Sequence, residues 1–187
     1  MTTPGIRAAQ SQTLLQTVRG LPEREQILAR VRPSVLEGIG AATPLAWIAM
    51  GEHMQLATAV RDVLGPARAI ETWRSTMLQS FERPFLKSFV SMTTSLLGIT
   101  PSSLLRRADV MYGHVVRDAG GLRYEATSEH GGIVSIRDYP ARFGFECWME
   151  GIQGCLLATI ELGRARGAVK LVESDDKRGF ARCDVSW

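Results

Sequence analysis

The hydrophobic residues of this chain change their period near residue 120, and this change limits the folds that the chain can adopt. Before that point they recur at helical spacing. In 101–118 they fall on a single helical face, and this face holds Leu104, Leu105, Ala108, Met111, Tyr112 and Val115. After that point Leu122, Tyr124 and Ala126 alternate with polar residues, which is the two-residue period of a strand. The chain therefore places helices first and strands later.

The strand pattern occurs twice, on either side of one further helix. The segments Leu122–Asp138 and Ala168–Trp187 each contain two alternating stretches around a turn, which predicts two hairpins. The segment between them, about Phe143–Gly163, has helical period. We therefore predict an α+β fold, in which N-terminal helices precede a ββαββ unit with a four-stranded, mainly antiparallel sheet covered by helices.

Helix-breaking residues divide the N-terminal part into separate helices. Pro22, Pro33 and Gly38 interrupt the first apolar segments, and a longer helix is expected from Thr43 as its N-cap to Gly65 as its C-terminal residue. No repeat, low-complexity tract or linker divides the chain. We expect one domain over 1–187, with a leader at 1–20 that could be flexible, a mainly helical part at 21–118 and the ββαββ part at 119–187.

Composition excludes several classes of partner. The chain has 22 basic and 19 acidic residues, a formal net charge of +3, and the basic residues form isolated pairs, so we expect no nucleic-acid partner. Its apolar runs are far shorter than the roughly 20 residues that span a bilayer, so we expect no membrane span. The start MTTPGIRAAQSQ lacks an apolar signal segment and only three cysteines are present, which favours a cytoplasmic protein with reduced thiols.

The helix near 145–163 combines glycines with cysteines. Small residues form one stripe along it, namely Gly144, Cys147, Gly151, Cys155 and Ala158. Such a stripe lets another backbone approach closely, which offsets the roughly 1 kcal/mol that glycine costs in a helix. Cys147 and Cys155 are about 12 Å apart along the axis, too far for a disulfide or a shared metal ion. They are either plain core residues or the lining of a ligand cavity, where one could accept an acyl chain.

One histidine and an aromatic ladder are candidates for a binding site. His53 falls in the middle of the apolar face of its helix, where it is either a hydrogen-bonded core residue or a pocket residue, as a polar anchor or an axial haem ligand. A ladder at i, i+4 follows, formed by Trp73, Met77, Phe81, Phe85 and Phe89, and it fits both a core and a pocket wall. We predict an apolar cavity between sheet and helices, bordered by His53, Trp73, Phe81, Phe85 and Cys155.

Sequence signatures of catalysis are absent. The chain contains no nucleophile-elbow, phosphate-loop, dinucleotide-binding or zinc-protease motif and no cysteine pair at zinc spacing. An enzyme is therefore the least favoured class, without being excluded, and we name no catalytic or metal-binding residue.

The segment TPSSLLRRADVMYGHVVRDAGGL, the Gly- and Cys-bearing helix and the ending GFARCDVSW resemble an uncharacterised family of myxobacterial proteins. That family is distantly similar to the fold shared by 4-vinyl reductase domains, haem-based nitric oxide sensors and trafficking-complex subunits of the Bet3 type. The resemblance implies a pocket for a small molecule or lipid, in a sensory or scaffolding role. Only Cys183 remains of the cysteine-rich ending of the reductases, and the Tyr-x-Ser-x-Arg signature of the haem sensors is missing, so haem is the less favoured cofactor.

Two functional hypotheses follow. The first is a non-enzymatic ligand-binding or signalling module, whose apolar pocket holds a small apolar molecule or acyl chain and which couples to a protein partner. The second is a purely structural module for protein interaction or dimerisation that holds no ligand.

Overall fold

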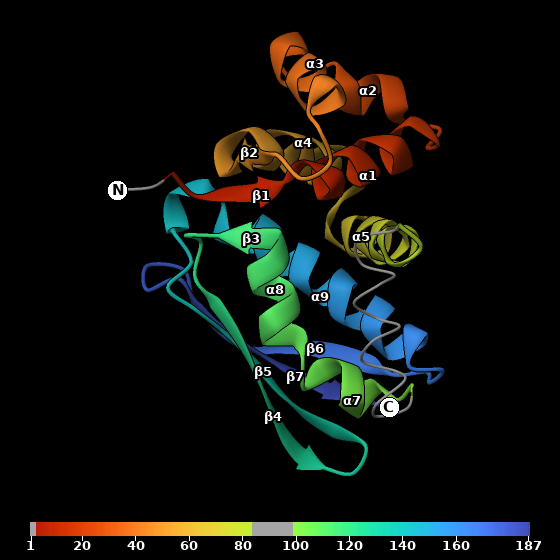
Figure 1. Cartoon of the computed structure of the whole chain (residues 1–187), viewed down its shortest axis with the longest axis vertical. Coiled ribbons are helices and arrows are strands. Elements are labelled where there is room, and N and C mark those ends of the chain that lie inside the picture. Colours follow the sequence, from red (N-terminus) through yellow and green to blue (C-terminus); the bar gives the residue numbers. More distant parts are fainter. Residues whose placement is uncertain (1–2, 84–98) are drawn as a thin grey trace.

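The computed structural model describes residues 3–83 and 99–187 and builds them into two antiparallel sheets and a set of packed helices (Figure 1). The first part contains β1 (Gly5–Arg7), α1 (Ala8–Arg19), α2 (Arg24–Leu28), α3 (Pro33–Ala41), β2 (Trp47–Ala49), α4 (Met50–Leu64) and α5 (Pro66–Phe81). The second part contains α7 (Pro101–Leu105), α8 (Ala108–Val115), β3 (Val116–Arg117), β4 (Gly121–Ser128), β5 (Gly131–Arg137), η1 (Ala141–Phe143), α9 (Phe145–Leu162), β6 (Ala168–Asp175) and β7 (Phe180–Ser186).

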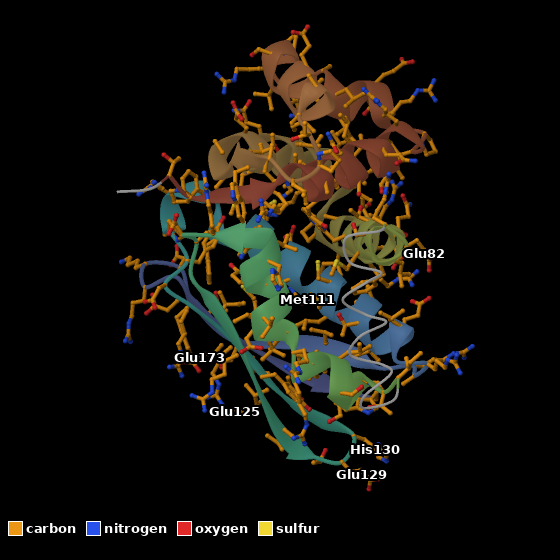
Figure 2. All side chains as sticks on the ribbon, viewed as in Figure 1. Glu82, Met111, Glu125, Glu129, His130 and Glu173 are labelled. Carbon is orange, nitrogen blue, oxygen red and sulfur yellow. The ribbon has the colours of Figure 1, made fainter. Side chains whose placement is uncertain are left out.

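The larger sheet has four strands in the order β4-β5-β7-β6, and every neighbouring pair is antiparallel. Its inner face is apolar, since Val134 and Ile136 of β5 are buried beside Ala181 and Cys183 of β7, and α9 covers this face. The outer face is polar, and Glu125 and Glu173 project from it (Figure 2). The predicted α+β fold with two hairpins and a covering helix is confirmed.

The smaller sheet has three short strands in the order β2-β1-β3, also antiparallel. Ile6, Ile48 and Val116 point from its three strands into the core. The sequence patterns did not predict this sheet, because a strand of two or three residues is too short to show alternation. The helix expected from Thr43 therefore begins only at Met50, after β2.

Residues inside the expected leader 1–20 belong to the packed fold. Residues 5–19 form β1 and α1, and Leu14 and Val18 of α1 are completely buried. Their role was missed because the apolar residues of this segment that reach the core, namely Ile6, Ala8, Leu14, Leu15 and Val18, are interspersed with polar ones.

The most extensive helix contact in the described chain joins α5 and α9, and two glycines permit it. A Cβ atom at Gly154 would lie 2.5 Å from the backbone oxygen of Ile70 and 2.5 Å from Cβ of Trp73. One at Gly151 would lie 3.3 Å from the indole ring of Trp73. Gly144, expected in the same stripe, instead caps α9 with φ = 81°. The small residues therefore allow α5 to lie directly on α9.

The three cysteines are free thiols. Cys147 and Cys183 are buried, and Cys155 is half-buried. Within residues 3–83 and 99–187 no helix has the length and apolar character to cross a membrane.

Candidate ligand cavity

A cavity of about 90 Å³ lies where α5, α8 and α9 meet the inner side of β1 and β3. Its described lining comes mainly from large apolar side chains, among them Trp73 and Met77 of α5, Met111 and Tyr112 of α8, and Trp148 and Leu156 of α9. Met111 projects from α8 into this space (Figure 2). Both sheets also contribute to the wall, through Ile6 of β1, Val116 of β3 and Leu122 of β4. The wall therefore joins residues that are far apart in the sequence.

The wall carries few polar groups and no charged side chain among the described residues that line it. Oγ of Ser80 donates a hydrogen bond of 3.2 Å to the side-chain oxygen of Gln10. The side-chain nitrogen of Gln10 has no hydrogen-bond partner in the described part of the chain. The indole N–H of Trp148 is buried and has no partner there either. The cavity thus offers the neutral amide of Gln10 in an apolar lining, which suits an uncharged ligand.

His53 lies directly behind this wall. Its ring centroid is 5.5 Å from that of Trp73 and 6.4 Å from that of Trp148, and both tryptophans line the cavity. Nδ1 of His53 shares a hydrogen bond of 2.9 Å with Oγ of Ser11. Nε2 is buried and has no hydrogen-bond partner within residues 3–83 and 99–187. Burial lowers the pKa of His53 to about 4, so its imidazole is neutral at pH 7.

The predicted site residues divide into four groups. Trp73 and Cys155 line the cavity, and His53 packs behind it. Phe81 is buried in a small apolar cluster with Met77 and Met111, beside the cavity rather than on its wall. Phe85 lies outside the described residues.

Sequence reasoning missed the contribution of α8, α1 and β1 to the wall. The apolar face of 101–118 was recognised, and it supplies Met111 and Tyr112. It was interpreted as core, because an apolar helical face looks the same whether it meets side chains or a cavity. Ile6 and Gln10 were overlooked because their segment was expected to be a leader.

Among the described residues of the wall, none is prepared for acid–base or nucleophilic chemistry. Burial raises the pKa of the Cys155 thiol to about 12, so the thiol is protonated at pH 7 and is a poor nucleophile. Burial also raises the pKa of Tyr112, whose hydroxyl donates to the carbonyl of Ala119 at 2.7 Å. The described wall is therefore suited to binding a ligand by contact.

A second, larger hollow of about 370 Å³ lies between α4 and η1. It is more open to solvent, and Arg30, Asp62 and Arg142 are part of its lining. Its charged groups favour water or ions over an apolar ligand.

No family model matches this chain, and no curated protein sequence matches it. Its fold is that of H-NOX domains. The Fe(II) unliganded H-NOX protein of K. algicida, in an engineered variant, superposes with a TM-score of 0.68 at 12% identity, over 97% of this chain and 96% of the other. An oxygen-binding H-NOX domain related to soluble guanylate cyclases gives 0.58 at 19% identity, over 93% and 89%. A structure from work on haem distortion in the H-NOX family gives 0.62 at 18%, over 96% and 93%.

The cavity of this chain does not fit a haem group. Its volume of about 90 Å³ is below the ~150 Å³ of an engineered cavity that takes benzene, and a porphyrin is several times larger than benzene. The described wall has no cation to pair with the two propionates, and buried charges need partners. It also has no histidine, since both tryptophans lie beside His53 and line the cavity in its place. The fold is that of H-NOX domains, but the described wall of this chain lacks the groups that would hold a haem.

Proposed function

We propose that this chain is a non-enzymatic sensory module that binds a small, uncharged, mostly apolar molecule in the cavity between α5, α8 and α9. The observation that carries this proposal is the wall itself, which is apolar, uncharged and formed by elements from both parts of the chain. Ligand cavities in proteins typically have this composition, with a few placed polar groups.

The size of the cavity limits the ligand. A cavity smaller than the ~150 Å³ that holds benzene accepts a molecule of only a few heavy atoms without rearrangement. A long acyl chain would require α5, α8 and α9 to separate. We therefore favour a compact neutral molecule that accepts one hydrogen bond from the side-chain amide of Gln10.

A ligand in this position would act on several elements at once. Trp73 and Met77 belong to α5, Met111 to α8 and Cys155 to α9, so a bound molecule would contact three helices together. Protein interiors are closely packed and transmit small displacements. This supports a role in which the occupied and empty states differ in helix positions that a partner protein can recognise.

Xenon is a suitable probe, because it enters small apolar cavities without needing hydrogen bonds. Methyl resonances of Met77 and Met111 should shift under xenon pressure in the wild type. In Ala108→Leu the added side chain fills the cavity, since Ala108 lines it, and the shifts should disappear. The matched control is Ala67→Leu, at an exposed position in the first turn of α5, which should leave them unchanged.

Wild-type methyl groups that do not respond to xenon would refute the cavity proposal. Equal responses in the wild type and Ala108→Leu would refute it as well, because the xenon would then bind elsewhere. Either result would favour the structural module without ligand.

A further inference from the structure

Two arginines and a tryptophan meet on the outer face of the small sheet β2-β1-β3. The guanidinium carbon of Arg7 lies 3.8 Å from the ring centroid of Trp47, and that of Arg117 lies 4.8 Å from it. Each of the three strands contributes one of these residues, and all three side chains are half-buried. We refer to Arg7, Trp47 and Arg117 as the arginine face.

The strand register explains how the arginine face forms. Arg7 is directly opposite Trp47, while Gly5, two residues before Arg7, is opposite Arg117. These positions share one side of the sheet, because side chains alternate along a strand. Gly5 has no side chain to block the path, so Arg117 lies across it to reach Trp47. A Cβ atom at Gly5 would lie only 3.4 Å from Nε of Arg117 and 2.9 Å from the carbonyl oxygen of Ile48.

The positive charges of the arginine face have no acidic partner in the described chain. Nε of Arg7 donates to the carbonyl oxygen of His114 at 3.2 Å, and a second nitrogen donates to that of Leu45. Nε of Arg117 is buried without any hydrogen-bond partner among the described residues. Other arginines differ in this respect, for example Arg61 and Arg68, which pair with glutamates at 2.8 Å.

This arrangement keeps two like charges close together. Both guanidinium groups stack on one indole, which places them within about a Debye length of each other, about 10 Å at 0.1 M salt. Cation–π contact with the indole attracts each arginine but does not neutralise it. The stacking also fixes the planar groups in place, so they lose little conformational freedom when an anion binds.

We infer that the arginine face binds the carboxylates of an acidic segment in a partner protein. Guanidinium groups match carboxylates in a two-pronged geometry, and charge-assisted hydrogen bonds are the stronger kind. Leu45, whose backbone oxygen accepts from Arg7, leaves 57% of its surface exposed beside this face. A protein segment can cover an apolar side chain while it pairs with the arginines, which a free anion cannot do.

The arginine face adjoins the cavity through the strands that carry it. Ile6 and Val116 line the cavity, and each is the direct neighbour of one of the two arginines. The binding inference is nevertheless independent of the proposed cavity ligand, and it is tested without one. Failure of either proposal leaves the other intact.

A fluorescein-labelled peptide of eight glutamates serves as the probe, with fluorescence anisotropy in about 0.1 M salt as the readout. The double variant Arg7→Gln/Arg117→Gln should weaken peptide binding by at least about tenfold, the value of one charge-assisted contact. Its matched control is Arg107→Gln/Arg123→Gln, which removes the same charge at two exposed positions outside the face. The control should change binding by less than about threefold, as expected for unspecific attraction screened by salt.

Single variants guard against loss of folding, because Arg7 also binds two backbone carbonyls. Arg117→Gln should fold normally and still reduce binding, and Arg117→Lys should restore it only in part, since lysine lacks the planar fork. Equal losses in the double variant and its control would overturn the inference, and so would a wild-type protein that does not bind the peptide. Arginine-dependent binding to phosphatidylserine vesicles without peptide binding would overturn it in favour of a membrane surface.

Discussion

Acidification should destabilise this protein through His53. The pKa of this residue is about 4 in the folded protein, whereas an unperturbed histidine titrates near 6.5. Below pH 6.5 His53 is therefore protonated in the unfolded chain but still neutral in the folded chain, so the free energy of unfolding falls. The full contribution is present above pH 6.5 and is lost as the pH falls towards 4.

The magnitude follows from the two pKa values. A difference of one pH unit corresponds to about 1.4 kcal/mol, so the complete effect is about 3 kcal/mol, of which about 2 kcal/mol is lost between pH 7 and pH 5. The structure gives the cause, because His53 is completely buried and its charged form would lose its contact with water. Its neighbours are two tryptophan rings and the hydroxyl of Ser11.

Urea unfolding at pH 7 and pH 5 measures this loss directly. The range ends at pH 5 because carboxylates paired with arginine, such as Glu23 and Glu71, have a lowered pKa and add their own loss only below pH 4.5. His53→Gln should remove most of the pH dependence, whereas His130→Gln, in an exposed turn, should retain it. A wild-type protein that is equally stable at both pH values, or an unchanged slope in His53→Gln, would refute the reasoning.

Three further predictions concern α9. Gly154→Ala should lower the free energy of unfolding by about 1–3 kcal/mol, because its Cβ atom would lie 2.5 Å from atoms of α5. The control Gly38→Ala, in α3 with open space around it, should raise the free energy of unfolding by up to about 1 kcal/mol. Thermal unfolding of both variants measures this. Arg61→Met should lower the free energy of unfolding in urea by about 2 kcal/mol, because the buried carboxylate of Glu150 then loses its ion pair of 2.8 Å with Arg61. The double variant Arg61→Met/Glu150→Met should recover most of this loss. At pH 8 a thiol reagent should modify Cys155 about a thousandfold more slowly in the native protein than in urea. The reason is that the pKa of the Cys155 thiol is about 12 in the folded protein and 9 in the ordinary, unburied state. Equal rates in the two states would contradict this.

The four-stranded sheet could be predicted because its strands are long enough to show their period. Residues 122–126 alternate over several positions, and so do Ala181, Cys183 and Val185 at the end of the chain. The contact of α9 with another backbone was also visible, since glycines inside a helix need a reason. The sequence did not show that α5 is the helix in contact, because a stripe of small residues says nothing about its partner.

The small sheet lay beyond the same reasoning, and the lining of the predicted cavity could be named only in part. Strands β1 and β3 contain three and two residues, and their pairing depends on chain segments more than 100 residues apart. A cavity depends on volumes that side chains leave unfilled, which no periodicity records. Trp73 of α5 and Cys155 of α9 could be named as candidates because they lie on inward faces. Phe81 lies on the same face of α5 as Trp73 but packs beside the cavity.

The similarity to the H-NOX structures concerns the fold, whereas the function of this chain depends on the side chains that the fold brings together. A fold fixes where helices and strands meet, and here it is shared at 12–19% identity. What the meeting point can hold depends on the side chains there, and a haem needs an axial ligand, cations for its propionates and a wide gap between the helices. In this chain Trp73 and Trp148 line the space between α5, α8 and α9, the described wall has no cation, and the cavity measures about 90 Å³. We therefore propose a smaller, neutral molecule for this junction. On the opposite side of β1 and β3 lie Arg7 and Arg117, which have no acidic partner in the described chain.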